Sequence, residues 1–170
     1  TTGAMPKSVG DTMRNLERQG NPWALPPESR MDWAEGLEVR ELAPGDETDV
    51  LYFVGCTASY DTNVEEVGIN TVNIFEAAGV DFGILGNKEK CCGSVLLRMG
   101  DAASFKRICM ENIEQFNALG IKTLVTACAG CYSTFVNEYT GELDFEVLHI
   151  VEFIARLIAE ERLTFKKELD

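Results

Sequence analysis

Hydrophobic and polar residues alternate from Asp49 onward in a way that predicts four rounds of strand followed by helix. Residues 50–54 form a continuous apolar run rich in β-forming residues, which is typical of a strand buried on both faces. Similar runs predict further strands at 80–85, 122–127 and 145–148. Apolar residues at helical spacing predict helices at 63–78, 102–119, 131–139 and 151–160. The order indicates an α/β fold, a parallel sheet of about four strands with helices on both faces.

The first 48 residues have a different pattern. All five prolines lie here, among Gly, Asp, Glu and Arg, and no core-forming run is visible. Trp23 and Trp33 are the exceptions, since buried indoles commonly fix a segment against a neighbouring surface. We therefore expect residues 1–48 to be an irregular linker or docking segment, and residues 49–170 to be the cysteine-rich α/β domain.

The length and the net charge of the chain exclude some classes of function. A chain of 170 residues can form one well-packed core. Its formal charge of −13 argues against nucleic acid as a partner, because phosphate binding requires clustered cations. No apolar run approaches the roughly 20 residues that span a bilayer, and the N-terminus lacks a signal-peptide pattern. We expect a cytoplasmic domain, associated with a membrane only through a partner.

Five of the six cysteines mark the ends of predicted strands. In a parallel sheet the carboxyl ends of the strands meet at one edge, where ligands bind. We therefore expect the five thiols to surround one pocket at that edge. The last of them falls in the first turn of a predicted helix, where the helix dipole favours the thiolate. The five candidate metal-binding and cofactor-binding residues are Cys56, Cys91, Cys92, Cys128 and Cys131.

The number and spacing of these thiols favour a multi-iron cluster. A structural zinc ion takes four ligands, and two adjacent cysteines rarely both reach one small ion. A cluster spreads several irons over a larger volume, so the adjacent Cys91 and Cys92 can bind different irons. Two alternatives stay open: zinc on four of the five thiols, and a dithiol/disulfide pair.

Two further residues carry candidate chemistry. Cys109 lies on the apolar face of a predicted helix, near Ile108 and Ile113, and is interpreted as a small core residue. His149 is the only histidine and is a candidate catalytic proton donor to a leaving thiolate. The alternative for His149 is a hydrogen bond to backbone at a strand–helix junction.

The cysteine spacing, C-x34-C-C-G-x35-C-x-x-C, resembles the cysteine-rich CCG domain of heterodisulfide reductase catalytic subunits and of the iron–sulfur subunits of glycolate and lactate oxidases. The resemblance extends to the context of residues 89–93 and 97–101, and to the spacing of His149 and Glu152. The early stretch 21–33 resembles the segment that joins a ferredoxin-like domain to the first CCG domain in the D-type heterodisulfide reductase proteins.

The resemblance implies a non-cubane four-iron iron–sulfur cluster on the same five cysteines, although some CCG domains hold zinc. It also implies an iron–sulfur redox domain of a heterodisulfide-reductase-like oxidoreductase. Such a domain transfers electrons to or from a disulfide, a flavin or a quinone-linked partner. The implied partners are other redox subunits or domains, whether ferredoxin-like, flavin-containing or a membrane cytochrome, with a disulfide as possible substrate. Full proteins of the family usually carry two CCG domains, so we expect this chain to be one domain of a larger protein or a partner-dependent subunit.

Overall fold

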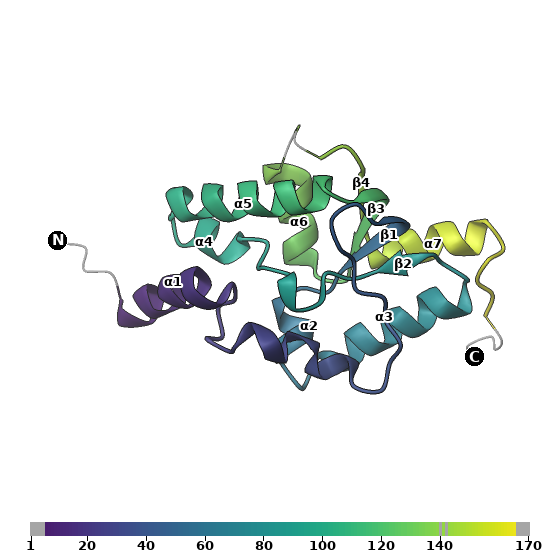
Figure 1. The fold of residues 1–170 in the computed structure, drawn as a ribbon, viewed down its shortest axis with the longest axis horizontal. Helices are drawn as coiled ribbons and strands as arrows, with labels where there is room; N and C mark the ends of the chain where they lie inside the picture. The colour runs from purple at the N-terminus through teal and green to yellow at the C-terminus, as the bar shows by residue number, and fades with distance from the viewer. Residues whose placement is uncertain (1–5, 140, 142, 166–170) are drawn as a thin grey trace.

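A parallel β-sheet forms the centre of the molecule (Figure 1). The structure is a computed structural model that describes residues 6–139, 141 and 143–165. Within these residues the sheet has four strands in the order β2-β1-β3-β4, and every neighbouring pair is parallel. The strands are β1 Glu47–Phe53, β2 Phe82–Gly83, β3 Gly120–Thr126 and β4 Glu146–His149. The predicted α/β class and parallel sheet are confirmed.

Helices cover both faces of the sheet. α4, α5 and α6 pack on one face, and α2, α3 and α7 on the other (Figure 1). The α-helices have the following bounds: α1 Lys7–Gln19, α2 Cys56–Tyr60, α3 Glu65–Ala77, α4 Ser94–Arg98, α5 Ala102–Asn117, α6 Ala129–Glu138 and α7 Ile150–Ala159. Two 3-10 helices, η1 Pro27–Ala34 and η2 Gly86–Lys88, lie in the connections.

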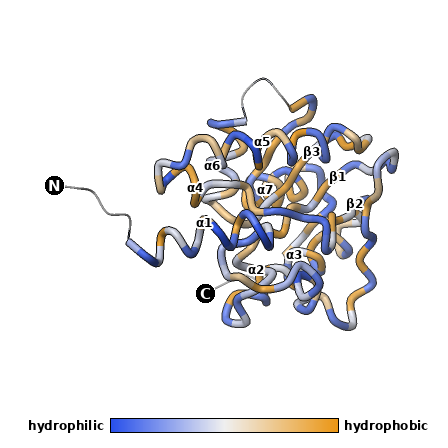
Figure 2. The backbone as a smooth tube through the Cα atoms, turned by 60° about the vertical axis from the view of Figure 1, so that its left-hand side comes forward, coloured by the Kyte–Doolittle hydropathy of each residue, from blue (hydrophilic) through white to orange (hydrophobic). Residues whose placement is uncertain are grey.

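The two faces of the sheet have separate hydrophobic cores because side chains alternate along a strand. Leu51 and Phe53 of β1 enter the core under α5 and α6, whereas Tyr52 enters the core under α3 and α7. The Phe53 ring meets Phe116 and Phe135 edge-on, with centroids 6.0 and 4.8 Å apart. Figure 2 shows hydrophobic residues along β3 and hydrophilic residues at many outer turns. The sheet is therefore packed against a hydrophobic core on each of its two faces.

The expectation of an irregular segment before residue 49 is wrong for residues 7–19, which form α1. Val9, Met13 and Leu16 recur at helical spacing, and Leu16 is buried. Pro6 precedes the helix, and Gly20 ends it in the left-handed conformation. The helix was not predicted because the segment as a whole is rich in proline, although residues 7–19 themselves contain none. Residues 1–5 lie outside the described residues.

The rest of this segment also contributes to the core. Trp33 and Leu42 are buried, whereas Trp23 is 41% exposed, so only one of the two indoles docks as expected. Residues 40–42 run beside the end of β2: Leu42 N–H donates to Ile84 O, and Ile84 N–H donates to Arg40 O. This pairing extends the sheet edge, where β2 itself is two residues long instead of the predicted 80–85.

No helix in the described part of the chain is both long enough and apolar enough to span a bilayer.

Candidate metal centre

The five cysteines lie at the carboxyl edge of the sheet, as predicted from their positions after the strands. Cys56 begins α2 directly after β1, and Cys91 and Cys92 follow η2, which comes after β2. Cys128 precedes α6 after β3, and Cys131 lies in the first turn of α6. Four of the thiols are buried, and Cys128 is partly exposed.

The five thiols contact one another in series. The Cys56 side chain interacts with Cys91, and Cys91 interacts with Cys92. Cys131 interacts with both Cys92 and Cys128, which completes the row. Among the residues that the structure describes, no group of three or more His, Cys, Asp or Glu side chains has the arrangement of a site for a single metal ion. The structure thus brings all five predicted residues together as a row of sulfurs.

Hydrogen bonding along the row separates the pKa values of the thiols. Interaction with the Cys131 and Cys91 side chains lowers the pKa of Cys92 well below its usual range. The hydrogen bond with Cys131 also lowers the pKa of Cys128 to about 5. Interaction with Cys91 together with burial raises the pKa of Cys56 well above the ordinary thiol value, and interaction with Cys128 and Cys92 together with burial does the same for Cys131. Within the row, the pKa values of Cys92 and Cys128 are therefore the lowered ones.

Asn112 and Tyr139 hold the backbone of the adjacent cysteine pair. The Asn112 Nδ2 group donates to Cys91 O and to the Tyr139 hydroxyl, each at 3.0 Å. The Tyr139 hydroxyl donates in turn to Cys92 O at 3.0 Å. Both side chains are buried, so α5 and the residue directly after α6 fix the two carbonyls of the pair. Neither residue was predicted from the sequence as part of the site, although a polar Asn112 on an apolar helix face was an available signal.

A buried ion pair lies beside Cys56. Arg30 and Glu89 are 2% and 4% exposed, and Arg30 Nη1 donates to Glu89 Oε1 at 2.7 Å. The other nitrogen, Arg30 Nη2, lies 3.4 Å from Cys56 Sγ as a donor. Glu89 also accepts from the N–H groups of Val54 and Gly55, each at 2.9 Å. In the sequence, Arg30 and Glu89 were noted only as members of the two stretches that resemble the CCG family, and their pairing was not predicted.

His149 and Cys109 are engaged in local structure. His149 Nδ1 accepts from Val151 N–H at 3.4 Å, and Nε2 lies 3.1 Å from Ala127 O. Because Nδ1 accepts, the neutral ring donates through Nε2. The Glu152 carboxylate accepts from His149 N–H and completes a capping box at the start of α7. These bonds favour the backbone-binding interpretation of His149, and Cys109 lies in the core on α5 as predicted.

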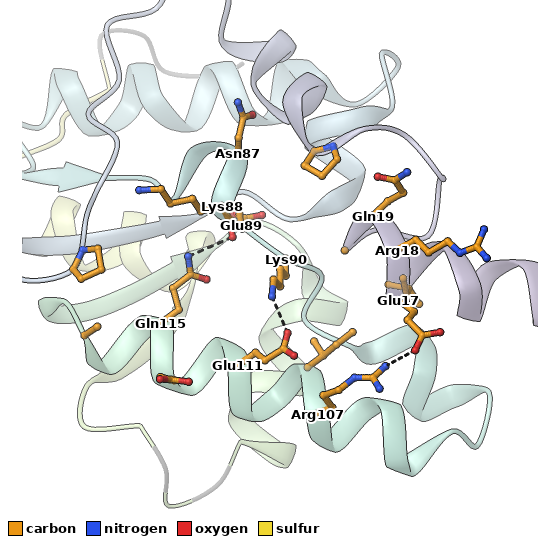
Figure 3. Close-up of a pocket in the computed structure, with 17 residues that line it drawn as sticks. Glu17, Arg18, Gln19, Asn87, Lys88, Glu89, Lys90, Arg107, Glu111 and Gln115 are labelled. Atoms are coloured by element: carbon orange, nitrogen blue, oxygen red, sulfur yellow. Dashed lines mark hydrogen bonds and ion pairs between the residues drawn. The ribbon is translucent and has the colours of Figure 1, made fainter.

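A polar cavity of about 770 Å³ lies behind the loop that carries Cys91, between α1 and α5 (Figure 3). Lys90 pairs with Glu111 at 2.8 Å, and Gln115 Nε2 donates to Lys88 O at 3.3 Å. These two contacts from α5 hold the loop from outside. The cysteines do not line this cavity, so the thiol row and the cavity are separate features.

Exposure predicts which thiol reacts first in the metal-free chain. We expect iodoacetamide to modify Cys128 before the other cysteines, because the other five side chains are buried. Peptide mass mapping after partial labelling measures the order, and loading the chain with iron and sulfide should protect Cys128. First labelling at Cys56 or Cys131 would contradict the placement of Cys128 at the open end of the row.

Comparisons with known proteins found a matching family model and several relatives. A family model described as a CCG cysteine-rich domain matches residues 50–136, just over half of the chain, and includes all five cysteines of the row. The chain is 34% identical to an EtfAB:quinone oxidoreductase of Syntrophomonas wolfei over 98% of its own length. It is 35% identical to a probable iron-sulfur-binding oxidoreductase of Bacillus subtilis over 96% of its length.

A third relative is a subunit of the dihydromethanophenazine:CoB–CoM heterodisulfide reductase of Methanosarcina mazei, which is 32% identical over 88% of the chain. The chain spans 24% of the length of each of the first two relatives and 37% of the third. No solved structure matches the chain.

Proposed function

This chain belongs to the CCG cysteine-rich domain family, and on that premise we propose that it is the iron–sulfur electron-transfer domain of a heterodisulfide-reductase-like oxidoreductase. The observation that carries the proposal is the row of five thiols from three strand ends. Two relatives with this domain are named as quinone and heterodisulfide oxidoreductases, and a third as iron-sulfur-binding. The proposed role is to pass electrons to or from a disulfide, a flavin or a quinone-linked partner.

The residues at the site fit an iron–sulfur cluster. All five donors are sulfur, the ligand that iron–sulfur clusters use. The backbone is open beside them: a Cβ on Gly55 would meet Cys131 Sγ at 3.5 Å, and one on Gly130 would meet Cys128 Sγ at 3.7 Å. Gly93 N–H already donates to Cys91 Sγ at 3.4 Å. When bound, such a cluster supplies one-electron redox chemistry.

The chain's own residues would hold and orient this group. The proposed ligands are Cys56, Cys91, Cys92, Cys128 and Cys131, in a non-cubane four-iron arrangement. Asn112 and Tyr139 keep the Cys91 and Cys92 carbonyls in place, so the backbone that carries the two adjacent thiols is fixed to the helical layer of α5 and α6. Cys128 lies at the partly exposed end of the row, and a disulfide or another redox group would approach the site from this end.

The proposed partners rest on the family resemblance and on the names of the relatives, which are longer than this chain. The chain spans 24 to 37% of the three relatives described above, so the remaining parts of those proteins supply other domains. We propose that this domain exchanges electrons with ferredoxin-like, flavin or membrane cytochrome subunits or domains. Any attachment to a membrane would come through such a partner.

Zinc is the second candidate. All five candidate ligands are thiols, and four thiolates are a typical ligand set of structural zinc, although no three of the described side chains have the arrangement of a single-ion site. In that case the domain would organise an oxidoreductase complex and would carry no electrons.

Anaerobic purification followed by iron, acid-labile sulfide and zinc analysis distinguishes the two candidates. The proposal predicts several irons per chain, matching sulfide and a broad visible absorption. Near-stoichiometric zinc without sulfide would overturn the electron-transfer role and support the structural one.

A further inference from the structure

The Arg30–Glu89 pair is unusual because both charges are buried next to a proposed ligand. Arg30 belongs to η1 in the N-terminal segment, and Glu89 lies two residues before Cys91. The carboxylate accepts three hydrogen bonds, from Arg30, Val54 and Gly55, so its charge is well satisfied. The Arg30 guanidinium also lies over the Tyr60 ring, 5.1 Å from its centroid. The side chain is therefore held in one position.

Stability alone is a poor reason for such a pair. Removing two charges from water is costly, and apolar residues of similar volume often stabilise a fold as well or better. The pair does, however, place the Arg30 guanidinium next to the Cys56 sulfur. Arg30 Nη2 lies 3.4 Å from Cys56 Sγ, while Nη1 bonds to the carboxylate. A guanidinium suits this task because its planar fork can serve both acceptors at once.

We propose that Arg30, oriented by Glu89, is a positioning residue that raises the reduction potential of the group bound at Cys56. This inference rests on the proposed iron–sulfur function. Reduction adds one electron from an external reductant to the bound group, and no bond breaks. The net charge of the bound group together with its thiolate ligands becomes more negative by one, so a buried cation at hydrogen-bond distance from one ligand would stabilise the reduced state more than the oxidised state.

Glu89 has the opposite electrostatic effect. Its negative charge is bonded to Nη1 of the guanidinium and partly offsets the field of Arg30 at the sulfur. Neutralising Arg30 should therefore lower the potential, whereas neutralising Glu89 should raise it. General loosening of the site does not predict opposite signs for the two variants.

Potentiometric titration of the anaerobically loaded 170-residue chain, followed by EPR and visible absorption, tests the inference. Arg30→Gln keeps N–H donors but removes the charge. We expect the ratio of reduced to oxidised cluster at a fixed potential to fall about tenfold, equivalent to about 59 mV for one electron. Glu89→Gln should shift the ratio upward, and Arg30→Lys should recover most of the parent value.

The matched control is Arg156→Gln. Arg156 forms an Arg–Glu pair of the same kind with Glu146, at 2.7 Å, but on the exposed surface at the opposite end of β4 from the cysteines. We expect the potential of this variant to equal that of the parent.

Each outcome bears on the inference. If Arg30→Gln holds the parent's iron and sulfide but has an unchanged potential, the inference is overturned. If that variant fails to retain iron, the potentials of Glu89→Gln and Arg30→Lys decide instead: a shift in Glu89→Gln that is absent or downward overturns the inference. Zinc without iron in the parent chain overturns the proposed function and this inference together, which distinguishes that failure from an unchanged potential in a loaded chain.

Discussion

Replacing Cys92 by alanine is expected to remove most of the iron and sulfide that the chain binds. Cys92 lies at the centre of the thiol row and interacts with both Cys91 and Cys131, so its loss divides the row in two. Removing a group that merely supports a ligand costs roughly 10–100-fold in metal affinity, and a direct ligand should cost more. Cys91→Ala should have the same effect. Iron and sulfide per chain after anaerobic loading, together with visible absorption, give the measurement.

Cys109→Ala is the matched control. This thiol is also buried and belongs to the same hydrophobic core, but it is not a member of the row. We expect the variant to bind the parent's amount of iron. An equal loss of iron in Cys109→Ala and Cys92→Ala would show that the loss reflects core damage, and it would overturn the ligand assignment.

Gly93→Ala should strongly destabilise the chain. Gly93 has φ 85°, in the left-handed region, and an added Cβ would lie 2.8 Å from Cδ2 of Phe105. The Phe105 ring is buried and packs edge-on against Tyr139, so it has little room to move. Left-handed backbone costs about 1–2 kcal/mol for a residue with a side chain. Overpacking adds about 1–3 kcal/mol, so the free energy of unfolding should fall by about 2–5 kcal/mol.

Gly100→Ala separates these two costs. Gly100 lies just after α4, has φ 81°, and an added Cβ would meet nothing within 4 Å. It therefore carries the backbone cost alone, about 1–2 kcal/mol. Urea unfolding of both variants, with the parent as reference, measures the difference. Equal destabilisation would mean that the Phe105 ring yields to the added methyl group, and that packing at the Cys-Cys-Gly turn is looser than the structure indicates.

The sequence predicted the sheet, the order of the long elements and the meeting of the five cysteines because each of these depends on a local pattern. An apolar run such as 50–54 indicates a buried strand by itself, and parallel strands bring their carboxyl ends to one edge. The helices α2 and α4 were missed because each is five residues long, which is too short to show a helical period.

The supporting polar contacts could not be predicted in the same way. Arg30 and Glu89 are 59 residues apart in the sequence, and Asn112 and Tyr139 are 27 apart. Nothing local at Arg30 identifies its partner, since an arginine near prolines and acidic residues is ordinarily solvent-exposed. Only the folded arrangement of η1 against η2 and α2 brings the guanidinium to Cys56.

The hydrogen bond from Cys91 N–H to Gly20 O, at 2.8 Å, joins the N-terminal segment to the same site that receives Arg30. In a protein assembled from exchangeable modules, recombination at residue 49 would transfer all five cysteines to a new host. It would leave behind the Gly20 carbonyl, which accepts from Cys91 N–H, and the Arg30 guanidinium beside Cys56. Glu89 would then remain buried without its counter-ion. If Arg30 acts on the bound group as proposed, the unit that can move between proteins with its redox properties intact is longer than the cysteine motif, and it begins no later than the end of α1.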